Sequence, residues 1–482
     1  MVASHTKPNE FDAVVVGSGP NGLAAAVTLA RAKLSVLVVE ANETIGGGTR
    51  SMELTLPGFV HDVCSAVHPL AVGSPFFRDL PLHEYGLEWI HPEIPLAHPL
   101  SGSEAVSLRR SLAETAHAIG IDGRTYKDLM NPLVEAWWEL AEEFLQPMIH
   151  LPRKPLALVR FGLRAIQPAQ WLARRFSTQP ARALFAGLAA HSFLPLSAPA
   201  SAAFGLVLGA AGHVVGWPFP RGGAQKISDA LAAYLRSLGG RIETGRRIST
   251  LAELPRSRAV LLDIAPKGFL NLAGSALSGR YRSNLEHFRY GPGVFKIDYA
   301  LNDPIPWSAD DCRRAGTVHV GGTYAEVAAS EYTVARQHAI PSNPFVLLAQ
   351  PTVNDPSRAP EGKHIAWAYC HVPGGSLCDL AGSIENQIER FAPGFRDCIL
   401  ARHVMNSADL ERHNANLVGG AVNGGSLDLR HLVIRPVLSL KPYRTPLSGV
   451  YLCSASTPPG GGVHGMCGYH AARLALKEVF RH

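Results

Sequence analysis

Residues 12–41 read DAVVVGSGPNGLAAAVTLARAKLSVLVVEA, and this stretch decides the fold. A β-branched run leads into a glycine-rich turn, an alanine-rich helical pattern and a second β-branched run that ends at Glu40. A strand, a helix and a parallel strand in this order form a βαβ unit. The sequence therefore predicts an α/β chain whose first domain is Rossmann-like.

The turn inside this stretch has the spacing G-x-G-x-x-G, at Gly17, Gly19 and Gly22. The first glycine permits the tight turn, the second lets the backbone approach a pyrophosphate, and the third lets the helix pack on the strand. Pro20 and Asn21 open the predicted helix, whose N-terminus would point at the phosphates of a bound dinucleotide. Together these features predict a dinucleotide site.

Glu40 closes the second strand. A carboxylate at this position can accept hydrogen bonds from both ribose hydroxyls of an adenosine, and it would repel a 2′-phosphate, so the site disfavours NADP. Only one complete fingerprint of strand, glycine turn, helix and terminal acid is present. A second site, for a pyridine nucleotide, is therefore not expected.

A second glycine turn follows at once. It reads ANETIGGGTR over residues 41–50 and leads to Gly58-Phe59 and Asp62. This layout resembles the phytoene-desaturase and amine-oxidase superfamily of FAD flavoproteins, whose second motif is an acid and alanine, then Gly-Gly-Arg, then Gly-Phe with Asp. The cofactor contacts that the resemblance implies are Ala41, Gly47, Gly48, Thr49 and Arg50, with Gly48 standing where the family usually has arginine.

Two downstream segments extend the resemblance. Residues 216–248 look like the segment that returns to the FAD domain, with Ile248 matching a strand whose backbone meets the adenine. Residues 449–476 read as a strand, a glycine-rich loop and a helix whose start would face the flavin. The contacts implied here are Ser454, Ala455, Gly465 and Met466, and Ser454 replaces the family's usual glycine.

The resemblance implies FAD as the cofactor and a Rossmann-like FAD-binding domain assembled from residues 1–75, 215–285 and 405–482. Residues 76–214 and 286–404 then form an interleaved α+β substrate domain. The first of these two segments is largely helical in pattern, whereas the second alternates strand-like runs with turns and contains one helix. We expect a sheet with helical cover above the flavin.

The function implied is that of an FAD-dependent oxidoreductase of the desaturase type, which moves hydride from a carbon of its substrate to flavin N5. An isoprenoid-like or lipid-like substrate is favoured because residues 183–220 contain no Lys, Arg, Asp or Glu and suit an apolar channel. Three alternatives share the motifs: a flavin-dependent amine oxidase, a polyene isomerase without net redox change, and a non-enzymatic lipid-binding or escort protein of the same fold.

His68 and His464 are the candidates for handling a substrate proton, because each adjoins a flavin-domain motif. The seven cysteines show no CxxC spacing, so no metal site and no redox-active disulfide is expected. A reducing, cytoplasmic compartment fits this cysteine usage.

Charge is unevenly distributed. The formal net charge is only +6, and no basic run interleaved with aromatic residues is present, so nucleic acid is not expected as a partner. Residues 144–228, however, contain no acid and nine basic residues. The basic and apolar side chains of residues 153–182 suit helices that rest on an anionic bilayer, which predicts a peripheral membrane contact beside the small apolar substrate.

Overall fold

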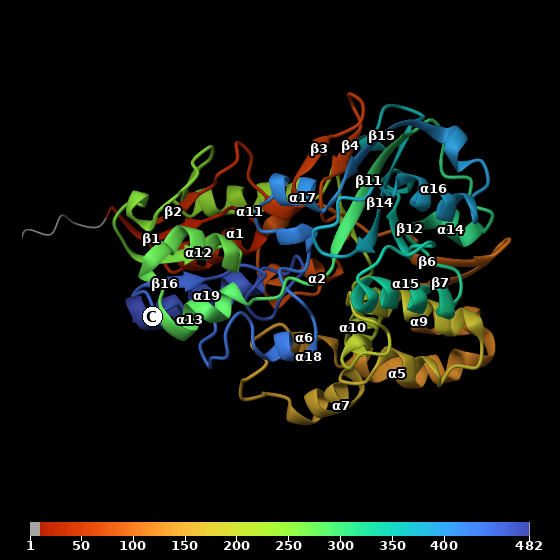
Figure 1. Cartoon of the computed structure of the whole chain (residues 1–482), viewed down its shortest axis with the longest axis horizontal. Coiled ribbons are helices and arrows are strands. Elements are labelled where there is room, and N and C mark those ends of the chain that lie inside the picture. Colours follow the sequence, from red (N-terminus) through yellow and green to blue (C-terminus); the bar gives the residue numbers. More distant parts are fainter. Residues whose placement is uncertain (1–9, 482) are drawn as a thin grey trace, which may run out of the picture.

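The computed structural model describes residues 10–481, and two sheets with their covering helices make up the molecule (Figure 1). The first sheet has five parallel strands in the order β16-β10-β1-β2-β9. Its strands are β1 (Phe11–Val16), β2 (Val36–Val39), β9 (Arg241–Glu243), β10 (Ser257–Leu262) and β16 (Val450–Leu452). This is the Rossmann-like sheet that the sequence predicts.

Three helices pack beside this sheet: α1 (Pro20–Arg31), α11 (Gln225–Ser237) and α19 (Met466–Ala475). The closing helix α19 approaches α1 very closely, since a Cβ added at Gly468 would lie 1.8 Å from the carbonyl oxygen of Asn21. Only glycine fits there. This contact joins the last segment of the chain to the glycine turn of the first.

The second sheet has seven strands in the order β15-β11-β14-β13-β12-β6-β7, all antiparallel except the β6–β12 pair. Its strands are β6 (Ile94–Ser101), β7 (Glu104–Leu108), β11 (Gly293–Leu301), β12 (Ala315–Val320), β13 (Val346–Ala349), β14 (His364–Val372) and β15 (Ile399–Met405). One face packs Phe295 and Ile297 into a core with Ile384 of α16 (Ala381–Glu389). The other face is directed toward the first sheet.

A helical layer lies below the second sheet and the middle of the molecule in Figure 1. It consists of α4 (Leu112–Ile119), α5 (Gly123–Glu135), α6 (Trp137–Phe144), α7 (Pro155–Ala165), α8 (Ala169–Ala173), α9 (Gln179–Ala190) and α10 (Ser201–Val214). Within the described part of the chain, no helix is long and apolar enough to cross a membrane. The uncharged tract instead forms much of α9 and α10, which pack against each other.

The remaining strands and α-helices are as follows. The strands are β3 (Ser51–Glu53), β4 (Val60–Asp62), β5 (Trp89–Ile90) and β8 (Phe219–Pro220). The helices are α2 (Pro69–Val72), α3 (Pro75–Arg78), α12 (Pro266–Ala273), α13 (Gly279–Glu286), α14 (Asp310–Arg314), α15 (Tyr324–Gln337), α17 (Ser407–His413) and α18 (Leu429–Val433).

Three expectations about local structure need correction. Residues 286–404 contain the three helices α14, α15 and α16 instead of one, because the chain forms two further helices between the strands of the second sheet. The helical pattern expected over residues 76–214 is interrupted by β6 and β7, which belong to the second sheet. Ile248 lies in a loop rather than a strand, because β9 ends at Glu243 and the chain then turns at Gly245, whose φ is +68°. The amide of Gly245 donates to the carbonyl oxygen of Asn42, which fixes this turn beside the end of β2.

Candidate functional site

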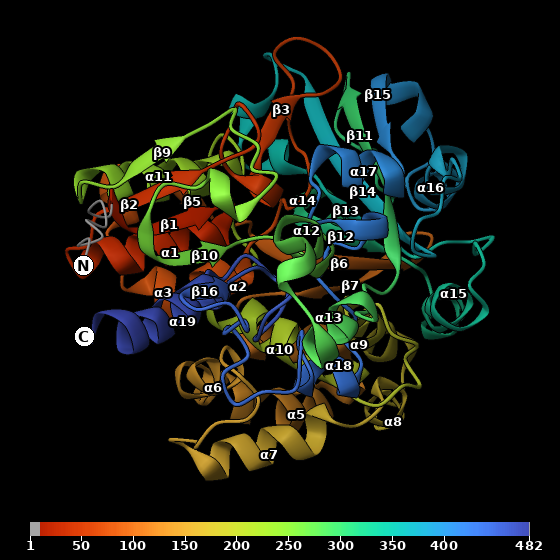
Figure 2. The same cartoon turned by 60° about the vertical axis from the view of Figure 1, so that its left-hand side comes forward.

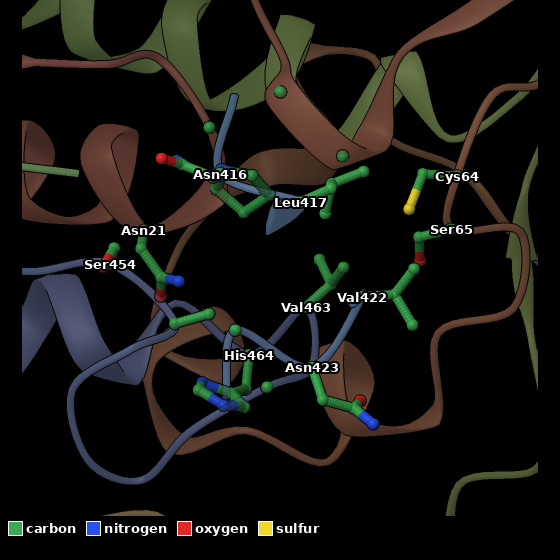
Figure 3. A pocket seen from close by; sticks show the side chains of 18 of the residues that line it. Asn21, Cys64, Ser65, Asn416, Leu417, Val422, Asn423, Ser454, Val463 and His464 are labelled. Atoms are coloured by element: carbon green, nitrogen blue, oxygen red, sulfur yellow. The ribbon is translucent and has the colours of Figure 1, made fainter. Parts of the chain in front are cut away.

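A cavity of about 1050 Å³ extends from the glycine turn of β1 to the helical layer. Figure 3 shows how segments far apart in sequence surround it: Asn21 and Cys64 come from the first part of the chain, and Asn416, Ser454 and His464 from the last. Its size is that of a site for a large organic ligand. Glu40 lines one end, whereas Phe161 of α7 lines the other.

The first glycine turn takes the shape expected of a phosphate-binding loop. Gly17 has a φ of +101°, and a Cβ added at Gly22 would lie 2.0 Å from the carbonyl oxygen of Gly17. Gly19, Pro20 and Asn21 line the cavity. The Oδ1 atom of Asn21 is buried and has no hydrogen-bond partner among the described residues, so this polar atom is available to a ligand.

Glu40 lies at the end of β2, where the cavity wall also includes Ala41 and Ile248. Its carboxylate accepts hydrogen bonds from the amide and hydroxyl of Ser18, at 2.9 and 2.7 Å, and from the amide and side chain of Asn42, at 2.9 and 2.8 Å. Burial alone would raise the pKa of Glu40, but these hydrogen bonds outweigh it and lower the pKa. Glu40 is therefore an anion fixed at one end of the cavity.

Asp263, which follows β10, is a site residue that sequence reasoning missed. Its Oδ2 atom accepts the amide of Gly22 at 2.9 Å and lies 2.8 Å from the position of a Cβ added at Gly19. Burial, assisted by the charge of Glu40, raises the pKa of Asp263 to about 7. Asp263 therefore borders the phosphate-binding turn as an acid that loses its proton near neutral pH.

The second glycine turn lies against the first, since a Cβ added at Gly47 would be 3.0 Å from the Cα atom of Gly19. Gly47, Gly48 and Arg50 line the cavity. The Arg50 guanidinium donates to the carbonyl oxygens of Gly47 and His413, at 3.1 and 2.9 Å. Arg50 therefore also ties the turn to the C-terminal segment.

Most of the predicted cofactor residues line this one cavity. They are Gly17, Gly19, Pro20, Asn21, Glu40, Ala41, Gly47, Gly48, Arg50, Ile248, Ser454 and Ala455. Gly22, Thr49, Gly465 and Met466 lie behind its wall instead. The hydroxyl of Thr49 hydrogen-bonds Ser228 at 2.7 Å, and a Cβ added at Gly465 would meet the ring of Phe76 at 2.6 Å.

The start of α19 also differs from expectation. The amide of Met466 donates to Nδ1 of His464 at 3.0 Å, so this amide is already used within the closing loop. The residues of this loop that face the cavity are Gly461, Gly462, Val463 and His464. The wall is therefore built by the loop before the helix rather than by the first turn of the helix.

Both candidate catalytic histidines line the cavity. In His464, Nδ1 accepts the Met466 amide and Nε2 lies 3.2 Å from the carbonyl oxygen of Gly460. In His68, Nε2 hydrogen-bonds the hydroxyl of Ser65 at 2.8 Å, and Nδ1 is buried without a partner among the described residues. Burial lowers the pKa of each to about 4, so both rings are neutral at pH 7. His464 therefore uses both ring nitrogens within its own loop, whereas Nδ1 of His68 has no partner among the described residues. A role for either ring in handling a substrate proton stays a prediction.

A buried ion pair on β11 is the second feature that sequence reasoning missed. Lys296 lines the cavity, is only 2% exposed, and donates to Asp298, which is fully buried. Burial lowers the pKa of Lys296, while burial would raise that of Asp298 but the adjacent ammonium lowers it. His61 and His403 each lie 3.7 Å from Asp298. Lys296 thus brings positive charge to the cavity wall.

The far end of the cavity is mostly apolar. On the second sheet, Trp367 and Tyr369 of β14 line it, with ring centroids 5.1 Å apart and planes at 67°. The helical layer adds Phe144, Leu145, Leu158, Phe161, Ala203, Phe204, Val207, Leu208 and Trp217. This composition suits a hydrophobic ligand.

Cys64 is the cysteine on the cavity wall. Burial raises the pKa of its thiol to about 11, so the thiol is protonated at neutral pH and a poor nucleophile. All seven cysteines, each within the described residues, are free thiols. The site therefore contains no disulfide.

Comparison with known proteins agrees with this geometry. The family described as NAD(P)-binding Rossmann-like domain matches residues 15–80. Pyridine nucleotide-disulfide oxidoreductase domain-containing protein 2 of Rattus norvegicus is 25% identical, over 98% of this chain and 94% of its own length. Phytoene dehydrogenase of Streptomyces griseus is 24% identical, over 85% of this chain and 80% of its own.

A solved structure of putrescine oxidase has the same fold, with a TM-score of 0.61 at 19% identity over 98% of this chain and 99% of that chain. The fold is therefore that of the FAD amine oxidases, and a dinucleotide cofactor fits both the matched domain and the cavity. The chain is homologous to pyridine nucleotide-disulfide oxidoreductase domain-containing protein 2 and to the phytoene desaturases, and these similarities support a place in the superfamily of FAD-dependent oxidoreductases.

Proposed function

We propose that the chain binds FAD and oxidises an apolar substrate by removing hydride from carbon, as a desaturase does. The main observation in support of this proposal is that the cavity is continuous between two regions of different chemistry. It runs from Glu40 and the glycine turns, past Lys296, to a region walled by apolar side chains such as Phe161 and Val207. A dinucleotide and an apolar substrate can therefore share one space.

The residues present fit FAD. Glu40 is an anionic acceptor for ribose hydroxyls, and Gly19 and Gly47 line the part of the cavity where a pyrophosphate would lie. Asn21 adds a buried oxygen atom without a partner among the described residues. FAD, when bound, supplies an acceptor for hydride at its N5 atom.

The remaining tasks belong to the protein. Lys296 contributes a fixed positive charge, which stabilises negative charge that develops nearby in a low-dielectric site. The apolar wall excludes water and orients the carbon skeleton of the substrate. Trp217 of this wall is held by its indole nitrogen, which donates to the carbonyl oxygen of Leu208 at 3.2 Å.

The carboxylates among the described lining residues argue against a cationic amine. They are Glu40 and Asp263 at the dinucleotide end and Glu143 near α7. Glu143 accepts hydrogen bonds from His150, at 2.6 Å, and from the amides of residues 153 and 154. Its two oxygens are therefore engaged, and the apolar end offers an ammonium group no open counterion.

Anaerobic reduction of the bound flavin tests this proposal. A panel of apolar polyenes and terpenes, primary amines, NADH and NADPH should be mixed with the purified protein, and the visible flavin absorbance followed. We expect bleaching by at least one apolar compound and none by the nicotinamides. Bleaching by amines alone would support an amine oxidase instead. If a polyene were converted only after the flavin had been reduced, with no net redox change, an isomerase would be supported. A protein that never binds flavin would support an escort role.

The affinity for FAD should depend on pH through Asp263. Its neutral form tolerates an adjacent pyrophosphate, whereas its ionised form repels one, so the dissociation constant should rise above pH 7, by up to about tenfold per pH unit. Asp263→Asn should flatten this dependence, because the amide oxygen can still accept the Gly22 amide. Titration of the apoprotein with FAD across pH measures this dependence, with Asp229→Asn, at a half-buried site outside the cavity lining, as control. An unchanged pH profile in Asp263→Asn would refute this role.

A further inference from the structure

Helix α7 has two apolar faces. Leu158, Phe161 and Ala165 line the cavity. On the opposite face, Leu156 is 74% exposed and Leu163 is 65% exposed. An amphipathic helix in a soluble layer normally directs its apolar stripe inward and its polar residues outward. In α7 the outward stripe is apolar as well.

This outward stripe continues into neighbouring residues. We define the α7 surface as the exposed apolar side chains Leu151, Leu156, Val159, Leu163, Ile166 and Trp171. Figures 1 and 2 both place α7 at the outer edge of the molecule, with no other element of the described chain beyond it. A surface of large apolar side chains in this position is typical of an interaction site.

Basic side chains occur along the chain beside the α7 surface: Arg160 lies on α7, and Arg174 and Arg175 follow Trp171 by three and four residues. Arg174 is also close enough to Tyr324 of α15 to interact with it electrostatically. Arg160, Arg174 and Arg175 are exposed, and none has a carboxylate within 4.0 Å among the described residues. Arg153 and Lys154 differ: they lie 3.5 Å from Glu142 and 2.7 Å from Glu139, both on α6. The basic cluster expected from the sequence is thus smaller in the structure, because α6 brings acids to the start of α7.

The cavity reaches the molecular surface beside α7. Met148, Ile166 and Leu429 line the cavity and are also 52%, 55% and 38% exposed. Ile166 belongs both to this opening and to the α7 surface. A molecule that approaches along the α7 surface therefore has a short apolar route into the cavity.

We propose that the α7 surface rests on an anionic lipid bilayer and that the opening beside it admits the apolar substrate from the membrane. The apolar side chains would enter the acyl boundary, while the three arginines contact anionic headgroups. A second copy of the chain fits less well, because a two-fold contact would bring these unpaired arginines together. The substrate part of the proposal rests on the proposed function, whereas the binding surface does not.

Co-sedimentation with vesicles tests the binding surface. The full chain should sediment with vesicles that contain phosphatidylglycerol, less so at high salt, and poorly with phosphatidylcholine alone. Replacing Arg160, Arg174 and Arg175 by glutamine should weaken the partitioning about a hundredfold. Leu156→Ser with Leu163→Ser should also weaken it, whereas Leu377→Ser with Leu400→Ser, at exposed sites elsewhere, should not.

Flavin content serves as the folding control, since none of the substituted residues lines the cavity. Retained flavin with lost vesicle binding supports the proposal, and it does so whichever substrate the enzyme oxidises. If the chain sedimented equally little with both kinds of vesicle, the proposal would be overturned. A dimer in solution that the Leu156 and Leu163 substitutions dissociate would also overturn it, because the α7 surface would then be a contact between copies.

Discussion

Gly19→Val should yield a folded protein without bound FAD. A Cβ at this position would lie 2.8 Å from Oδ2 of Asp263, so the valine would displace the carboxylate that accepts the Gly22 amide and would distort the turn expected to hold the pyrophosphate. We expect the flavin content to fall at least about tenfold, since the loss of about 1.4 kcal/mol of binding energy already has that effect. The absorbance of the purified variant measures it.

Gly382→Val is the matched control for this substitution. Gly382 lies in α16, far from the cavity wall in sequence and packing, and a Cβ added there meets nothing within 4 Å. The Gly382→Val variant should retain its flavin. If Gly19→Val also retained full flavin absorbance, the placement of the pyrophosphate at the first glycine turn would be wrong.

Lys296→Met should destabilise the protein strongly. The substitution leaves Asp298 fully buried without its ammonium partner, and loss of one member of a buried ion pair costs about 3–5 kcal/mol. Adding Asp298→Asn should recover much of this loss, because the double variant buries no unpaired carboxylate. Urea unfolding, followed by circular dichroism, gives the free energy of unfolding of each variant.

A surface pair provides the comparison for Lys296. Arg390, whose side chain is 39% exposed, pairs with Glu326, and Arg390→Met should change the free energy of unfolding by less than about 1 kcal/mol. Equal effects of Lys296→Met and Arg390→Met would show that Asp298 is not held as a buried anion. A double variant no more stable than Lys296→Met would contradict the pairing.

The parts of the site predicted well from the sequence are local ones. The βαβ unit of residues 12–41 places Gly17, Gly19 and Glu40 within one short segment, so turn, helix and strand end are set by neighbouring residues. The same holds for the closing strand and helix, β16 and α19. In each case the hydrophobic periodicity and the glycine spacing are sufficient to predict the elements and the turn between them.

The features that were missed depend on contacts distant in sequence. Asp263 acquires its role because β10 lies beside β1, which brings it to Gly22. Lys296 and Asp298 alternate with apolar residues along β11, and this alternation was the available signal that one strand face is polar and buried. The strand β6 was obscured by Pro95 and Pro99, which are unusual between two paired strands.

The roles predicted from residue type alone depend on surroundings that only the fold shows. His464 adjoins the closing helix as expected, yet both ring nitrogens hydrogen-bond the loop that carries it. Arg153 and Lys154 are basic and exposed, yet α6 supplies them with acidic partners. A residue's neighbours across the fold decide such roles, and a single sequence does not specify them.

Identification of the nucleotide released by denaturation tests the central claim most directly. The purified protein, before and after incubation with FAD, should be unfolded by heat, and the supernatant analysed by chromatography against FAD, FMN, NAD and NADP standards. We expect FAD in one-to-one ratio with the chain, and no nicotinamide nucleotide. A folded protein that releases NAD or NADP, or that takes up no FAD at all, would contradict it.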